Sequence, residues 1–362
     1  MIAQRVGLIQ RVLPAYRAPF FDLLAQSCAG GLSVFYGQPR EDEALGVQGE
    51  LKIAIPAPAK NVHIGRGKAY LCWQRGVTGW LEDWNPQVLV VEANPRYMST
   101  PAAQRWMKSR HRPVIGWGLG IPLGGGWLRS AWRKRLLGGF DALITYSQTG
   151  AAQYRAAGFP AGRVFTAPNA VTRKPDEPAP QRAGEFVGGR GKVLFVGRLQ
   201  ARKRIDLLLR ACARLPEQMQ PQLTVVGEGP ERAALQALAE QVYPRAEFCG
   251  DLRGEELAQR FREADLFVLP GTGGLAVQQA MSYALPVLVA EADGTQADLV
   301  REGNGRVLPP GDEDALVAEL GAALSNPARL RQMGAESYRI VAEEVNLERM
   351  VRVFAEAISS VL

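Results

Sequence analysis

The chain has 362 residues, of which 47% are hydrophobic and 22% are charged, and its formal net charge is +7. This composition is typical of a folded globular protein rather than a disordered one, and the length allows two domains of ordinary size. No apolar run is long enough to cross a bilayer and no signal-peptide pattern opens the chain, so we expect a cytoplasmic protein.

The positive charge is concentrated in the first half. Residues 1–180 hold 22 Lys and Arg against 11 Asp and Glu, a net charge of +11, whereas the remainder carries −4. This asymmetry indicates an anionic partner for the first half. Nucleic acid is one interpretation, but the chain has no helix-turn-helix, zinc-finger or RNA-binding aromatic motif, so we expect no nucleic acid. An anionic membrane surface or lipid substrate fits better.

The first half alternates short apolar runs with helical segments, which predicts a parallel sheet with helices on both faces. The predicted strands are residues 5–10, 32–36, 51–55, 88–91, 114–117 and 142–146. The clearest predicted helices are residues 19–26, 102–110 and 151–157.

A segment rich in proline and glycine separates the halves and predicts a domain boundary. We therefore expect a first domain at residues 1–172, a linker at 173–191 and a second domain at 192–345. The second half repeats the alternation of strands and helices to about residue 308, and further helices are expected from residue 313 and over residues 346–362.

Residues 193–281 contain the most informative pattern. An apolar run ends at Gly197 and is followed by Arg198 and Lys203, and a second run leads into the glycine-rich residues 271–276 and a helix. Glycines allow close approach of a ligand, and a helix start offers free N–H groups to an anion. Two cations beside such a helix start suit a diphosphate. The alternatives are a solvated cationic stretch and a simple turn between a strand and a helix.

These motifs, with Val225-Val226-Gly227-Glu228-Gly229-Pro230, Phe248-Cys249-Gly250 and Ala280-Met281, resemble the donor half of GT-B glycosyltransferases. More narrowly, the chain resembles the retaining glycosyltransferase family four. The resemblance implies two Rossmann-like α/β domains facing a cleft, with helix 346–362 returning to the first domain. It also implies transfer of a hexosyl group from a nucleotide-diphosphate sugar, without a metal, often to lipid-linked acceptors of cell-surface or exported polysaccharides.

The resemblance assigns residues to the donor. Arg198 and Lys203 would contact the diphosphate, whereas Arg202 and Arg204 remain surface residues. The other expected donor-binding residues are Gly197, Gly271, Thr272, Gly273, Gly274, Leu275, Ala276 and Gln279. In the family, the positions of Gly271 and Gln279 are normally glutamates that contact the sugar and the ribose. Because both are replaced, a non-catalytic sugar-nucleotide-binding homologue is the alternative function. A nucleotide-sugar epimerase would need acid or base residues that the sequence does not place.

The acceptor is expected on the first domain, where Glu92 ends a predicted strand. Glu92 would orient or deprotonate the acceptor hydroxyl, or it is a structural carboxylate paired with Arg96 or Arg17. The expected acceptor-side residues are Tyr16, Arg17, Asn94 and Trp117. His111 lies between arginines and is interpreted as a surface residue, so no histidine base is expected.

Residues 124–137 resemble a membrane-surface helix. Leu128, Ala131, Trp132 and Leu136 form an apolar stripe beside cations. The expected membrane contacts are Trp127, Trp132, Arg133, Lys134 and Arg135. An ordinary core-facing helix is the alternative.

We expect no metal site. Asp312-Glu313-Asp314 follows a turn and precedes a helical pattern, so Asp312 is interpreted as an N-cap. Cys28, Cys72, Cys212 and Cys249 are widely separated, which favours small buried side chains over ligands or disulfides.

Overall fold

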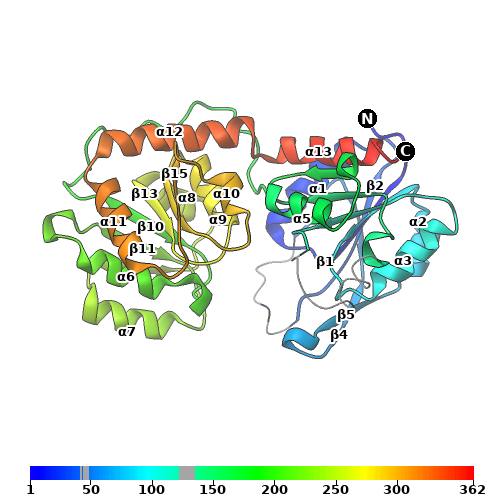
Figure 1. Ribbon diagram of the computed structural model, residues 1–362, viewed down its shortest axis with the longest axis horizontal. Helices are drawn as coiled ribbons and strands as arrows, with labels where there is room; N and C mark the ends of the chain where they lie inside the picture. Colours follow the sequence, from blue (N-terminus) through cyan, green and yellow to red (C-terminus); the bar gives the residue numbers. More distant parts are fainter. Residues whose placement is uncertain (41–42, 44–48, 122–134) are drawn as a thin grey trace. The chain divides into compact units, whose positions relative to one another are not determined.

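The computed structural model describes residues 1–40, 43, 49–121 and 135–362, which form two compact units (Figure 1). The first unit comprises Met1–Val171 and Leu347–Leu362, and the second comprises Thr172–Asn346. Each unit is an α/β domain built around a parallel sheet. The predicted fold class of two Rossmann-like α/β domains is therefore confirmed.

The sheet of the first unit has, in its described part, seven strands in the order β3-β2-β1-β6-β7-β8-β9, and all neighbouring pairs described are parallel. The strands are β1 (Val6–Val12), β2 (Leu32–Gly37), β3 (Ile55–Pro58), β6 (Val88–Glu92), β7 (Val114–Gly118), β8 (Ala142–Thr145) and β9 (Val164–Thr166). The central strands are buried apolar runs, because helices cover both faces of the sheet.

The helices of the first unit include one that comes from the far end of the chain. They are α1 (Ala18–Gln26), α2 (Val77–Trp84), α3 (Ser99–Lys108), α5 (Gln148–Ala156) and α13 (Leu347–Ser359), with short 3₁₀ turns η1 (Ala15–Arg17), η2 (Gly67–Ala69) and η3 (Ala161–Arg163). Phe354 of α13 packs with its ring 4.9 Å from the rings of both Phe20 and Trp117. The C-terminal helix therefore completes the core of the first unit (Figure 1).

The predicted strand at residues 51–55 is wrong. The carboxylate of Asp22 accepts hydrogen bonds from the backbone N–H groups of Lys52, Ile53 and Ala54, which holds this segment in an irregular turn. The strand β3 begins only at Ile55 and contains two prolines, which an edge strand tolerates because one side of it has no ladder to complete.

A hairpin that the sequence interpretation missed follows β3. The antiparallel strands β4 (Lys60–Ile64) and β5 (Leu71–Arg75) pair outside the main sheet. Most of their residues are half-buried or exposed, so neither strand is the continuous apolar run by which a buried parallel strand is identified in a sequence.

The second unit has a six-stranded parallel sheet, among its described residues, in the order β12-β11-β10-β13-β14-β15. Its strands are β10 (Lys192–Val196), β11 (Gln222–Val226), β12 (Ala246–Gly250), β13 (Leu266–Leu269), β14 (Val287–Ala290) and β15 (Gly305–Leu308). Its helices are α6 (Ile205–Arg214), α7 (Arg232–Val242), α8 (Gly254–Glu263), α9 (Leu275–Ser282), α10 (Gln296–Leu299), α11 (Glu313–Leu324) and α12 (Pro327–Glu343), with η4 (Ala201–Lys203) and η5 (Glu217–Met219).

The segment interpreted as a linker, residues 173–191, is described throughout and contains neither helix nor strand. It is attached to the second unit by Arg182, whose guanidinium donates hydrogen bonds of 2.9–3.0 Å to the carbonyl oxygens of Phe261, Ala264 and Tyr283. These contacts satisfy backbone acceptors at the ends of α8 and α9.

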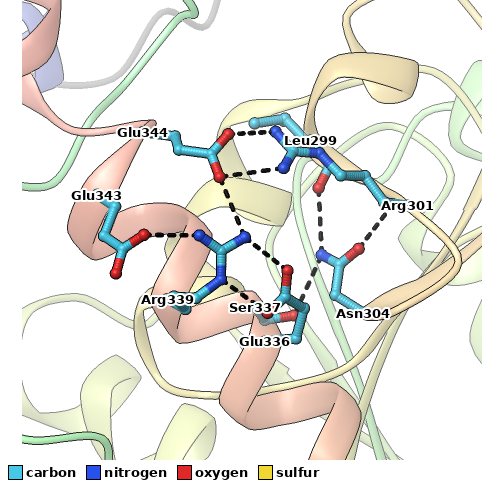
Figure 2. A network of polar contacts seen from close by, with 8 residues as sticks. All are labelled: Leu299, Arg301, Asn304, Glu336, Ser337, Arg339, Glu343 and Glu344. Atoms are coloured by element: carbon cyan, nitrogen blue, oxygen red, sulfur yellow. Dashed lines mark hydrogen bonds and ion pairs between the residues drawn. The ribbon is translucent and has the colours of Figure 1, made fainter.

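A polar network fixes the end of α12, just before the chain leaves the second unit (Figure 2). Arg339 bonds to three carboxylates, and Glu344 also forms a two-pronged ion pair with Arg301. Asn304 accepts from the backbone N–H of Arg301 at 2.6 Å and donates to Ser337 of α12. The loop before β15 and the end of α12 are therefore held together. The carboxylates around Arg339 are Glu336, Glu343 and Glu344.

Candidate functional site

Two loops meet at the carboxyl edge of the second sheet. Strands β10 and β13 are parallel neighbours, so the segment after β10 and the glycine loop (residues 271–276) after β13 leave the sheet side by side. The ammonium group of Lys203, at the end of η4, donates to the carbonyl oxygen of Thr272 at 2.5 Å. The N–H of Thr272 in turn donates to the carbonyl oxygen of Arg202 at 3.0 Å. Ligands of open α/β sheets bind at such an edge.

Two glycines allow this close contact. A Cβ atom at Gly271 would lie 2.2 Å from the carbonyl oxygen of Arg202, and one at Gly273 would lie 2.4 Å from Nζ of Lys203. Gly273 also has a φ of 145°, which other residues rarely adopt. Gly271 is thus required by the close backbone of Arg202, whereas Gly273 is required by its own backbone conformation.

Lys203 is buried without an ion-pair partner among the described residues. The pKa of Lys203 is lowered to about 8 by burial and, to a smaller extent, by the charge of Arg202, while the charge of Asp293 opposes this shift in part. An ammonium group has three donors, and only one is used by Thr272. A bound anion would therefore relieve the cost of burying this cation.

Arg202 is exposed, as expected for a surface residue, but it also takes part in the loop contact. Its guanidinium donates to Oγ1 of Thr272 at 2.7 Å. Arg204 is half-exposed and pairs with Asp206 at 3.2 Å. Arg198 is half-buried, and its side chain has no hydrogen bond or ion pair within the described part of the chain. Lys203 is therefore the predicted cation that the structure attaches to the glycine loop.

Helix α9 begins directly at the glycine loop, with Gly274 as its N-cap. The first N–H groups of the helix, at Leu275 and Ala276, lack acceptors within the helix and face its positive dipole end. Gln279 is half-buried, one turn further along the helix. Gly197 follows β10 with a φ of 157°, which residues other than glycine rarely adopt, and its N–H donates to the carbonyl oxygen of Val226.

The sequence interpretation missed a third loop at this edge. It follows β14, the next strand beyond β13, contains Asp293 and Thr295, and leads into α10, whose first residue is Gln296. Gln296 is 1% exposed and donates from Nε2 to the carbonyl oxygen of Gly273 at 2.6 Å, while its Oε1 has no partner in the described structure. Polar residues after a third apolar run were the available signal, but only the strand order shows that this loop adjoins the glycine loop.

In the first unit, Glu92 ends β6 and accepts a hydrogen bond from the backbone N–H of Arg11 at 2.5 Å. Among the described residues Glu92 forms no ion pair with Arg96 or Arg17, although the charge of Arg17 acts to lower its pKa. Burial raises the pKa of Glu92 to about 7, although the Arg11 amide and nearby positive charge oppose the shift. Glu92 can therefore exchange a proton near neutral pH.

The expected acceptor-side residues have different environments. Trp117 is 1% exposed and packs among core aromatics, so it is a core residue in this structure. Arg17 is 4% exposed, lies over the ring of Trp117 and donates to Asn169 at 2.8 Å. Tyr16 is 40% exposed, and the half-buried Asn94 accepts from the N–H of Arg96.

One of the expected membrane contacts, Arg135, lies within the described residues. Trp127, Trp132, Arg133 and Lys134 lie outside the described residues, and Arg135 is exposed. Among the described residues, no helix has the length and apolar character needed to cross a membrane.

The structure also describes the expected cap, His111 and the cysteines. Asp312 is the N-cap of α11 and accepts from the N–H of Ala315 at 2.9 Å. His111 is exposed. All four cysteines are free, and Cys249 is half-buried whereas the other three are buried. The described residues contain no group of His, Cys, Asp or Glu side chains suited to a metal ion.

The two α/β units, with a C-terminal helix that returns to the first, define the GT-B class of fold. Solved structures agree with this class: sucrose-phosphate synthase from Thermosynechococcus elongatus aligns with a TM-score of 0.74 at 19% identity, over 99% of this chain and 98% of that one. Anabaena Alr3699/HepE in complex with UDP also aligns at 0.74, with 16% identity, over 99% of this chain and 100% of that one.

Family models identify both units. Residues 177–340 match the model of glycosyl transferases group 1, and residues 22–170 match the glycosyl transferase 4-like domain. The chain therefore carries a domain of each of these two glycosyltransferase families.

Curated relatives match in part. The GDP-mannose-dependent alpha-mannosyltransferase of Corynebacterium glutamicum is 40% identical over 125 residues, 33% of this chain and 28% of that protein. Sulfoquinovosyl transferase SQD2 of Arabidopsis thaliana is 34% identical over 138 residues, 36% of this chain and 26% of that protein. Phosphatidyl-myo-inositol mannosyltransferase of Mycobacterium leprae is 31% identical over 203 residues, 53% of this chain and 54% of that protein. The chain thus spans about a quarter to a half of the lengths of these relatives.

Proposed function

We propose that this protein transfers a sugar from a nucleotide-diphosphate donor to a saccharide or lipid-linked acceptor, with retention at the anomeric carbon. The donor is held by the second unit, residues 192–345, and the acceptor by the first, residues 1–172 with the C-terminal helix. The observation that carries this proposal is the buried ammonium group of Lys203 at the glycine loop, beside the start of α9.

The chemistry follows from the charge of the leaving group. As the glycosidic bond breaks, the departing nucleoside diphosphate gains negative charge. Lys203, Arg198 and the first N–H groups of α9 would stabilise that charge without a metal ion. Gln279 would contact the ribose through its side-chain amide, which is a neutral partner.

The acceptor chemistry depends on Glu92. A carboxyl group with a pKa of about 7 suits a residue that orients or deprotonates an acceptor hydroxyl at neutral pH. The carboxylate is kept in place by the backbone N–H of Arg11, so it can face an acceptor without a salt bridge to neutralise it.

The names of some similar proteins point to lipid-linked acceptors. Their names include mannosyltransferases, one of them acting on phosphatidyl-myo-inositol, and an enzyme of the lipopolysaccharide outer core has the same fold. We therefore extend the proposal to the synthesis of cell-surface or exported polysaccharide by a cytoplasmic enzyme at the inner face of the membrane. The contact would be made by Trp127, Trp132 and the three cations at 133–135.

The membrane part has its own test. Replacing Arg133, Lys134 and Arg135 together by Ser should strongly reduce sedimentation with phosphatidylglycerol vesicles, because each cation near an anionic surface is worth about 1 kcal/mol. Unchanged sedimentation, or none by the parent protein, contradicts this part of the proposal.

A non-catalytic sugar-nucleotide-binding protein is the second candidate. It is favoured by Gly271, where any side chain would meet the backbone of Arg202, so the glutamate usual at this position cannot be accommodated without moving the loop. If the protein is catalytic, the role of that glutamate would have to be taken by other groups at this edge of the sheet, such as Asp293 and Gln296.

One experiment separates the two candidates. GDP-mannose and UDP-glucose are incubated with the protein in EDTA, with and without a lipid-linked acceptor, and release of the nucleoside diphosphate is measured. Turnover of either donor excludes the binding protein. A rise in melting temperature with a donor, without turnover under any condition, would support the binding protein and contradict glycosyl transfer.

A further inference from the structure

The first unit contains a cavity that no predicted site residue lines. It has a volume of about 820 Å³ and lies between the loop that follows β2, the end of β3 and the β4–β5 hairpin. This volume is within the range of small-molecule sites, and the position is again the carboxyl edge of parallel strands. We call it the hairpin cavity. Its polar lining residues include Arg40, Lys60, Asn61, His63 and Arg66.

The hairpin cavity adjoins Glu92 through a single residue, Arg11. The N–H of Arg11 donates to Glu92, and its carbonyl oxygen accepts from Nδ2 of Asn61 at 2.7 Å. The guanidinium of Arg11 forms an ion pair with Glu43 at 2.6 Å. A ligand in the cavity would therefore extend toward the carboxyl group proposed to act on the acceptor.

The charged residues that line the hairpin cavity, among those that the structure describes, are cations. Arg40, Lys60 and Arg66 line it, and none of its lining residues given by the structure is acidic. The carboxylate of Glu43 is already shared between Arg11 and Arg40, at 2.6 and 3.5 Å. Lys60 and Arg66 are exposed, and within the described chain their side chains have no hydrogen bond or ion pair. Two positive charges at the rim are thus left without a counter-ion.

The walls of the hairpin cavity are partly apolar. Pro39, Pro58 and Ala59 supply apolar surface. His63 is held by Tyr70, whose hydroxyl lies 3.0 Å from Nδ1. Burial, followed by the charge of Arg11, lowers the pKa of His63 and favours its neutral form. A concave wall with apolar patches and cations at the rim suits a charged saccharide better than the flat surface of a bilayer.

We infer that the hairpin cavity binds the anionic part of the acceptor, a carboxylate or phosphate carried by a saccharide. This inference rests on the proposed function, since it names the acceptor class for the site beside Glu92. Lys60 and Arg66 would form charge-assisted hydrogen bonds to the anion, and the neighbouring sugar would extend toward Glu92.

Binding to three trisaccharide probes, measured by calorimetry without donor at low salt, tests the inference. The probes are trigalacturonate, phosphorylated maltotriose and neutral maltotriose. At least one acidic probe should bind about tenfold or more tightly than maltotriose. The double variant Lys60→Ser, Arg66→Ser should lose about tenfold for the acidic probe and remain unchanged for maltotriose. The matched control is Arg155→Ser, Arg352→Ser, which removes two exposed cations from α5 and α13 and should bind as the parent does.

Three results would overturn the inference. These are the absence of acidic-probe binding by the parent, equal binding of neutral and acidic probes, and full binding by the Lys60, Arg66 variant. Vesicle binding that depends on the same two cations, without saccharide binding, would assign the cavity to the membrane and overturn it as well. The calorimetry contains no donor, so its result is independent of the turnover assay. If the parent binds an acidic probe but turns over no donor, glycosyl transfer is contradicted and the inference about the cavity is not.

Discussion

The ammonium group of Lys203 donates to the carbonyl oxygen of Thr272 at 2.5 Å and so attaches the segment after β10 to the glycine loop after β13. Both loops approach so closely that Gly271 has no room for a side chain. A buried lysine that uses only one of its three donors for Thr272, beside a helix start, is the observation on which the proposed diphosphate site rests.

Lys203→Ala should lower the turnover number by about 10²–10³ and raise the donor's Michaelis constant much less. The reason is that the leaving diphosphate carries more negative charge in the transition state than in the bound donor. Steady-state kinetics with the donor found by screening measures both constants.

Arg329→Ala, at the exposed start of α12, is the control for Lys203→Ala and should leave both constants unchanged. Arg202→Ala is not a neutral control, because Arg202 bonds to Thr272 and lowers the pKa of Lys203. Equal, small effects of Lys203→Ala and Arg329→Ala would place the diphosphate elsewhere.

The pH profile should report the lowered pKa of Lys203. Because that pKa is about 8 instead of 10.5, kcat/KM should fall as the pH rises through about 8 and the cation is lost. The stability of the protein without donor should change in the opposite direction. Between about pH 8 and 10.5 the unfolded chain holds the proton and the folded chain does not, so the contribution of Lys203 to stability rises with pH. In Lys203→Arg the alkaline fall in kcat/KM should move to higher pH, since arginine stays charged. An unmoved alkaline limb would show that another group titrates.

Glu92→Gln should abolish the acidic limb of the kcat/KM profile, which in the parent rises with pH through about 7. It should also stabilise the protein above that pH. The folded-state pKa of Glu92 is raised above 4.5, so its contribution to stability falls as the pH rises from about 4.5 to 7.

Melting temperatures of the Glu92 variant at about pH 5 and pH 8 check this sign. The gain over the parent should be larger at the higher pH, because the amide remains neutral and can still accept from Arg11. The exposed Glu82→Gln on α2 is the control, with no expected pH-dependent gain. A variant that is less stable than the parent at both pH values contradicts the raised pKa.

Gly271→Ala should destabilise the second unit by roughly 1–3 kcal/mol, because its Cβ would lie 2.2 Å from the carbonyl oxygen of Arg202. The same displacement should weaken donor binding by moving Lys203. Gly184→Ala, where a Cβ would meet no atom within 4 Å, is the matched control and should be nearly neutral. Chemical denaturation measures both, and equal stabilities would show that the loop relaxes freely.

Gln279→Glu should leave the melting temperature nearly unchanged, and the added charge should strengthen a hydrogen bond to the donor ribose. The half-buried Gln279 side chain has no hydrogen bond within the described structure. The neighbouring Gln278 is 0% exposed and donates to Thr172 and to the carbonyl oxygen of Val345, so Gln278→Glu should lower the melting temperature by several degrees. A large drop for Gln279→Glu would identify Gln279 as a packing residue.

Much of the fold could be predicted from the sequence because buried parallel strands are short apolar runs. The runs at 88–91, 193–196 and 266–269 all became strands, and the Pro- and Gly-rich composition of residues 173–191 corresponds to a segment without regular structure. Local signals also identified Asp312 as a cap and the glycine loop as a helix start, since both depend on residues close in the chain.

The tertiary structure decided what depends on distant residues. Asp22 prevents a strand at 51–55 through three hydrogen bonds across about 30 residues, and the half-exposed β4–β5 hairpin has no strong apolar pattern to reveal it. The strand order brings Gln296 to Gly273. Burial distinguishes Lys203 from the exposed Arg202, and burial also raises the pKa of Glu92 to about 7. A charge pattern is visible in a sequence, but the pKa of a charged group depends on the atoms that replace water around it, and these come from elements far apart in the chain.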